Sequence, residues 1–330
     1  MRACVLHLSL TVALVPPVVR PPSHVCSGAA YDYCIQSFGC TAEEADKAER
    51  RILLPNIVES LTRTQIEFVC DWLQSSLDLS DAELKKMVLT FPQMLSLSVE
   101  DNMAPKLDWL QKRLDLGDAQ LRKLVMTRPT LLGYSVEKNM APKLEWLQNY
   151  LDLDEGQLRK IVLRQPTLFG RNMAPKLEWL QRRLDLDNAQ LKKMVMMSPP
   201  LLSLSIEDKI EPNLDWLQTR LDLDAPELRK MVLSHPPLLQ YSVEGNLEPK
   251  LNFLEEELGL PVSEVRASIV TGPNRLSYSL NKRYRARLEV CRAAGVDAYP
   301  VLSYSSQTDA EFCKRAGVPL EALRAAQEDV

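Results

Sequence analysis

The residues best suited to do chemistry in this chain are pairs of adjacent cationic side chains that recur at regular intervals. Lysine and arginine arrayed along a surface neutralise phosphates and release counterions, which supplies most of the affinity of proteins for nucleic acid. The pairs therefore predict a ladder of phosphate contacts. The alternative is an ordinary solvated helix face, because Asp78, Asp81 and Glu83, and their copies, lie close to the pairs. The pairs are Lys85–Lys86, Arg122–Lys123, Arg159–Lys160, Lys192–Lys193 and Arg229–Lys230.

A second cationic segment, Thr271–Arg292, lies near the end of the chain. It contains one acidic residue, Glu289, and it interleaves Tyr278 and Tyr284 with its cationic residues. Aromatic rings among guanidinium groups suit contacts with nucleic acid, since rings stack on bases while the charges bind phosphates. The segment is therefore a second candidate for nucleic-acid binding, although some of its side chains must face the core. Its candidate residues are Arg275, Lys282, Arg283, Arg285, Arg287 and Arg292.

Residues for catalysis or for a bound cofactor are scarce. The chain has three histidines, and His235 stands at a repeat position that unrelated residues occupy in the other copies. The sequence has no glycine-rich phosphate loop and no GxSxG motif. Its seven cysteines include no CxxC pair, which argues against a zinc site and against a disulfide framework. We therefore expect no enzymatic activity, no cofactor and no bound metal.

Two sets of marker residues place the cationic pairs in a repeated unit. The aromatic markers are spaced 37, 37, 33, 37 and 37 residues apart, and the prolines follow the same intervals, including the same four-residue deletion. A period near 37 residues predicts a solenoid, in which each unit packs only on its neighbours. The markers are Trp72, Trp109, Trp146, Trp179, Trp216 and Phe253, with Pro92, Pro129, Pro166, Pro199, Pro236 and Pro273.

Each repeat is predicted to contain two helices and one short turn. Met103, Leu107, Leu110 and Leu114 have helical spacing, which places them on one face of a helix that runs roughly from residue 102 to residue 114. A second helix begins at a capping box and ends before the phased proline, because the residue before proline avoids the α region. The stretch after the proline favours a single 3₁₀ turn. The capping boxes are Ser80–Glu83, Asp187–Gln190 and Asp224–Glu227.

The cationic pairs follow the first apolar leucine of each second helix at offsets of one and two. These offsets predict that both members of a pair point away from the buried face. Helices that stack at roughly 8–10 Å would then align the pairs as a ladder along the solenoid.

Composition agrees with an all-α fold and restricts the partners. A hydrophobic content of 45% excludes a disordered chain, and only 11 glycines among 330 residues favours helix. The formal net charge is −4 at pH 7, so the chain as a whole does not attract polyanions. Any nucleic acid must be bound by a local basic surface.

The ends of the chain differ from the repeats. The first 31 residues contain no Asp or Glu and predict a cleaved targeting leader, which is too short and too interrupted to span a membrane. Both a secretory signal and an organellar transit peptide fit this segment. We expect an N-terminal helical cap at residues 32–65, the solenoid at residues 66–296 and a C-terminal helical cap at residues 297–330.

The repeats resemble those of the mitochondrial transcription termination factor (mTERF) family. "FPQMLSLSVEDNMAPKLDWL", "RPTLLGYSVEKNMAPKLEWL" and "HPPLLQYSVEGNLEPKLNFL" look like its repeats, and "PNRLSYSLNKRYRARLEVCRAAGV" at Pro273–Val296 looks like its last repeat. The likeness runs from about Ile66 to Val296. It implies a curved, right-handed superhelix of helix-helix-3₁₀ units whose concave basic face binds duplex DNA or structured RNA in mitochondria or plastids.

These observations lead to a functional hypothesis and one alternative. The hypothesis is an organellar protein, monomeric and not membrane-bound, that binds DNA or RNA and regulates transcription or its termination. The alternative is a scaffold that binds other proteins, such as an RNA polymerase or a ribosome-assembly partner, through its leucine-rich, acidic solenoid.

Overall fold

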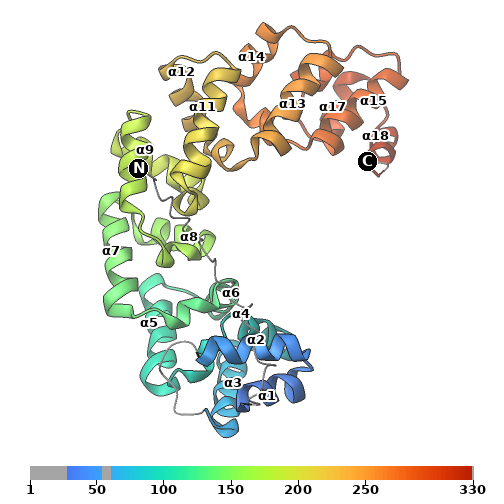
Figure 1. Ribbon diagram of the computed structural model, residues 1–330. Coiled ribbons are helices and arrows are strands. Elements are labelled where there is room, and N and C mark those ends of the chain that lie inside the picture. Colours follow the sequence, from blue (N-terminus) through green and yellow to red (C-terminus); the bar gives the residue numbers. More distant parts are fainter. Residues whose placement is uncertain (1–27, 54–60, 329–330) are drawn as a thin grey trace, which may run out of the picture. The chain divides into compact units, whose positions relative to one another are not determined.

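The computed structural model of this protein describes residues 28–53 and 61–328, and the regular structure of these residues is entirely helical (Figure 1). Residues 1–27, most of the predicted leader, lie outside the described residues. The first helix, α1, begins at Ala29, so it overlaps the end of the leader predicted at residues 1–31. The chain divides into two compact units, the first ending at Val99 and the second beginning at Glu100.

The described part of unit 1 consists of paired helices and one 3₁₀ turn. Helix α4 begins at the predicted capping box of Ser80 and Glu83. Helix α2 packs against α1 and η1, and Arg51 donates from Nη2 to the carbonyl oxygen of Thr90 at 3.1 Å. That bond satisfies a carbonyl group at the C-terminus of α4. The elements are α1 (Ala29–Phe38), α2 (Ala42–Leu53), α3 (Arg63–Leu77), α4 (Asp81–Thr90) and η1 (Pro92–Ser96).

Unit 2 repeats a module of a first helix, a second helix and a 3₁₀ turn, which confirms the predicted all-α solenoid. Figure 1 shows these modules following one another in the order of the sequence. The first helices are α5 (Ala104–Leu114), α7 (Ala141–Tyr150), α9 (Ala174–Arg183), α11 (Glu211–Arg220) and α13 (Glu248–Asn252), the last continuing into η10 (Phe253–Glu257). The second helices are α6 (Asp118–Thr127), α8 (Glu155–Arg164), α10 (Asn188–Met197), α12 (Ala225–Ser234) and α14 (Val262–Thr271). The 3₁₀ turns are η3 (Pro129–Gly133), η5 (Pro166–Gly170), η6 (Pro199–Ser203), η8 (Pro236–Gln240) and η11 (Pro273–Ser277).

Local chemistry sets the bounds of the second helices. In α10, the backbone N–H of Gln190 donates to Asp187 at 2.8 Å, and the N–H of Asp187 donates to the Gln190 side chain at 3.1 Å. This reciprocal pair satisfies two N–H groups that have no partner inside the helix. Helix α12 ends at His235, whose φ of −143° leaves the helical region directly before Pro236. The predicted capping boxes and proline stops are therefore confirmed.

A wide, π-helical turn precedes most of the first helices, and the sequence analysis did not predict it. In the wide turn before α7, the N–H of Met140 donates to the carbonyl of Ser135, five residues earlier, at 3.0 Å. Pro142 lies in the first turn of α7, where its missing N–H leaves no bond unmade. In the shortened repeat, η5 leads to α9 without such a turn. The wide turns are η2 (Val99–Met103), η4 (Val136–Met140), η7 (Ile206–Ile210), η9 (Val243–Leu247) and η12 (Leu280–Arg285).

Neighbouring modules of unit 2 pack through two continuous rows. The second helices α8, α10, α12 and α14 contact one another in succession, and so do the 3₁₀ turns η5, η6, η8 and η11. The predicted apolar residues Leu107, Leu110 and Leu114 are buried. Neither helix of a pair can bury its apolar face alone, so stacking closes one continuous core. The tryptophans of the first helices are half-buried at the edge of this core.

A ladder of cationic side chains, which the sequence analysis did not identify, ties most first helices of unit 2 to the 3₁₀ turn that ends the same module. Lys176 is buried, and its Nζ donates to the carbonyl oxygen of Leu202 at 2.9 Å. The acceptor is a carbonyl of the next 3₁₀ turn, which the turn itself leaves free to accept a bond. The bonds of this kind are Lys106 to Leu132, Lys143 to Phe169, Lys176 to Leu202 and Lys250 to Leu276.

Burial changes the acidity of these lysines. Loss of hydration lowers the pKa of Lys106, Lys176 and Lys250 from the usual 10.5 to about 8. In the fourth copy the same position is taken by Asn213. Its Nδ2 donates to the carbonyl of Leu238 at 3.3 Å and to that of Tyr241 at 2.9 Å. A neutral donor can therefore satisfy the carbonyls at the 3₁₀ turn of its module.

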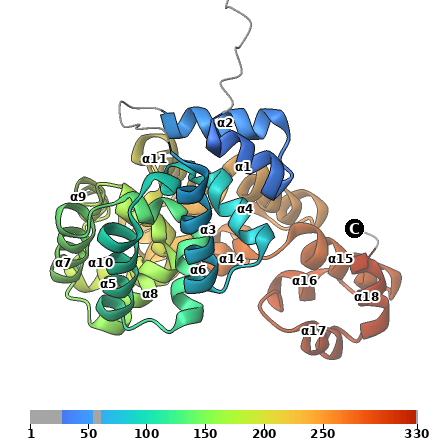
Figure 2. The ribbon, with the colours of Figure 1, turned by 90° about the horizontal axis from the view of Figure 1, so that it is seen from below.

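Four shorter helices complete unit 2, and they form one group in Figure 2. Arg287 takes the position of the buried lysines. Its guanidinium donates to the carbonyl of Tyr304 at 3.0 Å and to that of Gln307 at 2.8 Å. The last residue of the cationic ladder thus anchors the C-terminal helices. These are α15 (Ala286–Ala293), α16 (Tyr299–Ser303), α17 (Asp309–Ala316) and α18 (Leu320–Glu328).

We predict that replacing Lys176 by asparagine changes how stability depends on pH. Between about pH 8 and 10.5 the unfolded chain still carries a proton that folded Lys176 has released, so the stability of the wild type rises with pH relative to Lys176→Asn. The slope is at most about 1.4 kcal/mol per pH unit. Chemical denaturation of both proteins at several pH values measures it. A difference in the free energy of unfolding that stays constant across this range would contradict the prediction.

Candidate nucleic-acid interface

The five cationic pairs lie in the second helices, and the two members of each pair have different environments. In α8, Arg159 is half-buried whereas Lys160 is exposed, and the same difference holds in α4, α6, α10 and α12. The prediction that both members point to solvent is therefore correct only for the second member. The half-buried first members are Lys85, Arg122, Arg159, Lys192 and Arg229, and the exposed second members are Lys86, Lys123, Lys160, Lys193 and Lys230.

A first member binds the C-terminal end of a first helix in the preceding module. The Nη1 atom of Arg159 donates to the carbonyl oxygen of Asp115 at 2.8 Å and to its Oδ2 at 2.7 Å. Asp115 follows α5 in a left-handed conformation, with φ of 48°. The last carbonyls of a helix carry partial negative charge, so a guanidinium at this place is stabilised by both the helix and the carboxylate. We call this contact the turn clamp.

The turn clamp recurs along unit 2. Arg229 donates from Nη1 to Oδ2 of Asp185 at 3.0 Å and from Nη2 to Gln190 at 2.8 Å. Lys192 donates to the carbonyl of Asp152. Each turn aspartate has a φ between 47° and 50°. The clamp fixes the separation of adjacent modules, and its cations are already engaged.

Arg266 in α14 makes a further turn clamp that the sequence analysis missed. Its Nε donates to the carbonyl of Leu221 at 2.7 Å, and its Nη2 donates to the carbonyl of Asp222 at 3.0 Å and to Glu227 at 2.6 Å. The neighbouring residue is Ala267, so no cationic pair marks this copy. Arg266 follows the turn aspartate Asp222 by 44 residues, and Arg159 follows Asp115 by the same number. This constant spacing is the sequence signal that could have identified Arg266.

The second members are the cations of the pairs that remain available to a ligand. Lys123, Lys160, Lys193 and Lys230 occupy equivalent positions in four successive second helices of unit 2, and each is exposed. We call these four residues the lysine row. Arg159 and Arg229 form ion pairs, whereas the lysine row takes part in none of the ion pairs found among the described residues. The row therefore presents one ammonium group per module.

The cationic segment Thr271–Arg292 is used largely inside the protein, and Arg287 is its clearest case. Arg287 is 0% exposed, forms an ion pair with Asp309 at 2.7 Å and lies 4.4 Å from the ring of Phe312. Burial acts to raise the pKa of Asp309, but the bonds from Arg287 and Gln327 outweigh it and lower that pKa. No ligand can reach this guanidinium, so Arg287 does not belong to the interface, contrary to the prediction.

The other arginines of this segment also bond within the chain. Arg283 donates to the carbonyl of Ser305 at 2.8 Å and lies 4.4 Å from the ring of Tyr278. Tyr284 is buried and donates to the carbonyl of Arg275 at 2.8 Å. Arg283 thus joins η12 to the C-terminal helices, whereas Lys282, Arg285 and Arg292 are exposed. The remaining bonds are Arg275 to Ser268 at 2.7 Å, Arg285 to Glu257 at 2.8 Å and Arg292 to the carbonyl of Glu257 at 2.9 Å.

The described ranges show neither a metal site nor a membrane span. No group of three His, Cys, Asp or Glu side chains in residues 28–53 and 61–328 converges so that it could hold a metal ion. Over the same ranges, no helix combines the length and the apolar character that a membrane span requires.

Comparison with known proteins gives one match. The sequence model of a family described as mTERF matches residues 51–150 and residues 112–313, which together cover most of the chain. No curated protein matches the chain.

The two members of one pair should differ when each is replaced by glutamine. We expect Arg159→Gln to lower the free energy of unfolding by about 1 kcal/mol, because the carbonyl and carboxylate of Asp115 lose a charged donor. Lys160→Gln, its neighbour, is the matched control and should change stability by less than about 0.5 kcal/mol. Thermal or chemical unfolding measures both. If Arg159→Gln and Lys160→Gln changed the free energy of unfolding equally, the turn clamp would have no structural role that the exposed lysine lacks.

Proposed function

The chain belongs to the mTERF family, and from this premise we propose that it binds duplex DNA or structured RNA in a mitochondrion or plastid and so regulates transcription or its termination. The proposal takes the lysine row as the principal contact surface. It takes the turn clamps and the buried cationic ladder as the frame that holds the row in place.

The regular placement of the lysine row carries the proposal. Lys160, Lys193 and Lys230 lie on second helices that contact one another in succession, and Lys123 holds the equivalent position in α6. Stacked helices are separated by roughly 8–10 Å. One strand of a duplex carries a phosphate about every 3.4 Å along its axis, so each lysine meets about every third phosphate. A row of this kind can follow a backbone without reading its bases.

Electrostatics determines how such binding behaves. The net charge of −4 gives no overall attraction to a polyanion. The contact is therefore local, its affinity comes from the counterions that the row displaces, and it weakens steeply as salt is added. Specificity for a sequence would require additional side chains that contact base edges or sense the shape of the duplex. A protein held on the duplex in this way obstructs an advancing polymerase, which connects binding to termination.

We predict that replacing Lys123, Lys160, Lys193 and Lys230 together by glutamine weakens duplex binding about tenfold or more at low salt. The dependence of log affinity on log salt concentration should become shallower by about 0.9 for each phosphate that the variant no longer neutralises. Fluorescence anisotropy of a labelled duplex, titrated at several salt concentrations, measures both quantities.

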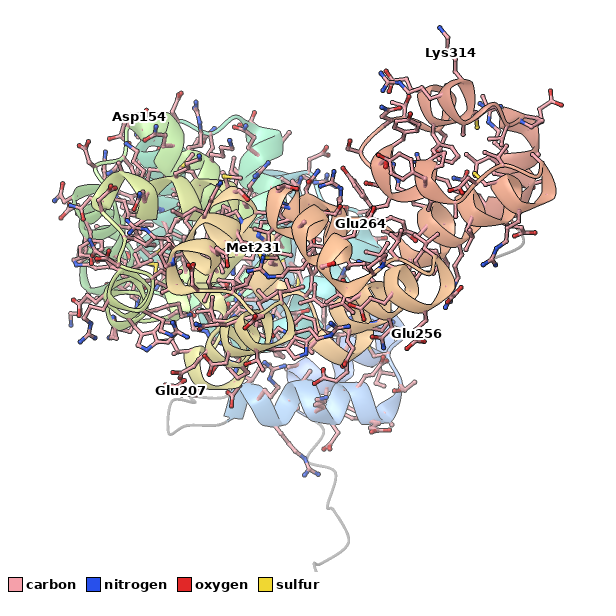
Figure 3. All side chains as sticks on the ribbon, turned by 90° about the horizontal axis from the view of Figure 1, so that it is seen from above. Asp154, Glu207, Met231, Glu256, Glu264 and Lys314 are labelled. Atoms are coloured by element: carbon pink, nitrogen blue, oxygen red, sulfur yellow. The ribbon has the colours of Figure 1, made fainter. Side chains whose placement is uncertain are left out.

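The matched control replaces four exposed cations outside the row, Lys112, Lys138, Lys314 and Arg324, by glutamine, so that the net charge changes by the same amount. Lys314, for example, points away from α17 (Figure 3). The control should keep most of the affinity and salt dependence of the wild type. If the two variants lowered the affinity for the duplex equally, the lysine row would not be the contact surface. If the wild type binds no nucleic acid even at low salt, the protein-binding scaffold becomes the better description.

A further inference from the structure

One repeated link between the two helices of a module is absent beside α12. In the other modules that carry it, a glutamine near the end of the first helix donates from Nε2 to the side chain of the first residue of the second helix. In α12 that first residue is Ala225, which offers no acceptor to Gln218. The links are Gln74 to Asp81 at 2.7 Å, Gln111 to Asp118 at 2.8 Å, Gln148 to Glu155 at 2.9 Å and Gln181 to Asn188 at 2.8 Å.

The missing side chain coincides with an enlarged groove. Between α10 and α12 a groove of about 610 Å³ is lined by Ala225 and Pro226, together with the end of α9. The equivalent groove beside α8 is lined by Glu155 and Gly156 and measures about 310 Å³. There Glu155 bridges to Arg113 at 2.5 Å and closes the space. We call the larger space the α12 groove. Its volume lies in the range of small-molecule sites.

The α12 groove is also cationic. Arg183 and Arg229 in its lining are engaged in ion pairs with Asp215 at 2.8 Å and Asp185 at 3.0 Å, so its uncompensated charge comes from two adjacent members of the lysine row, Lys193 and Lys230. In the equivalent groove beside α8, the lining holds two carboxylates, from the turn aspartate and from the first residue of α8, and these offset most of the positive charge. In the α12 groove, by contrast, two ammonium groups of the row border the same hollow. An anion is the ligand that this charge favours.

The floor of the α12 groove is apolar. Pro226 and Leu233 contribute aliphatic surface, and Ser234 adds a hydroxyl group at the edge. A free phosphate would leave this surface uncovered, whereas a flat heterocycle attached to a phosphate would cover it and still reach the lysines. The groove is thus complementary to a ligand with one anionic end and one flat, weakly polar end.

We propose that the α12 groove binds one nucleoside 5′-phosphate group, with its base on Pro226 and Leu233 and its phosphate between Lys193 and Lys230. If the nucleotide is part of a bound nucleic-acid strand, this inference adds a specific site to the proposed function and rests on that function. Ala225 is then the residue that opens the site, since Glu155 at the equivalent position of α8 occupies that space. The turn clamps and helix packing recur from module to module, and the small side chain of Ala225 creates a binding site beside α12.

The test uses the full chain and calorimetric titration with adenosine 5′-monophosphate, inorganic phosphate and adenosine as separate probes. We expect the nucleotide to bind about tenfold more tightly than either fragment, because only it engages both ends of the groove. Ala225→Glu, which copies Glu155 at the equivalent position, should abolish that binding without lowering thermal stability. Unchanged nucleotide binding in Ala225→Glu, or inorganic phosphate that binds as tightly as the nucleotide, would overturn the proposal.

A variant that opens the equivalent groove beside α8 should gain a second nucleotide-binding site. The double variant Glu155→Ala with Gly156→Pro removes the closing carboxylate beside α8 and supplies the equivalent of Pro226, while Arg113, Lys123 and Lys160 already hold the positions equivalent to the cations of the α12 groove. It should raise the stoichiometry of nucleotide binding from one site to two. A stoichiometry that stays at one would contradict the role assigned to Ala225.

Two further measurements separate the sources of the nucleotide and keep this proposal distinct from the proposed function. If the nucleotide belongs to a strand, a single-stranded oligonucleotide binds more tightly than the mononucleotide and loses that advantage in Ala225→Glu. If the groove takes free nucleotides, Ala225→Glu affects only the mononucleotide. Duplex binding that depends on Lys123 and Lys160, together with no mononucleotide binding, would refute the α12 groove and retain the lysine row.

Discussion

The fold and the stacking of the modules depend on backbone carbonyls that the turns leave without a partner and that cations from other helices satisfy. The turn after each first helix points carbonyls outward, and an arginine such as Arg159 binds them together with the turn aspartate Asp115. The 3₁₀ turn leaves another carbonyl, which a buried lysine such as Lys176 binds from the first helix of the same module. A buried carbonyl without a partner is costly, so the lysine bonds stabilise each module, while the arginine bonds connect one module to the next.

This use of cations decides what is left for a ligand. The chain is rich in lysine and arginine, yet the arginines of the C-terminal segment and the first members of the pairs are largely engaged in holding helices together. Arg287 is the extreme case, since burial and an ion pair with Asp309 remove it from any surface. The exposed lysine of each pair has no such task. An ammonium on a flexible chain in solvent can contact a phosphate at little structural cost.

A uniform stack gives individual positions room to vary. Because the frame is held by bonds that recur from module to module, a change at one surface position alters the local surface and leaves the frame intact. Ala225 is such a change: it removes one link within its module, and the α12 groove opens between two lysines of the row. The repeated modules therefore present the lysine row as a common phosphate-binding edge, and substitutions in single modules, such as Ala225, create distinct sites along it.

The sequence by itself determined the period, the two helices of each module, their capping boxes and their proline stops. These features follow from local chemistry, in which a side chain or a proline ring acts on its own backbone within a few residues. The family and the all-α solenoid followed from the same patterns. Only the tertiary structure decided which member of each cationic pair is free, that Arg266 forms a clamp, that Lys176 is buried and that Arg287 cannot meet a ligand. Those properties depend on which carbonyl the packing of the helices brings within reach, and residues some 26 to 45 positions apart in the chain carry no local signal of that contact.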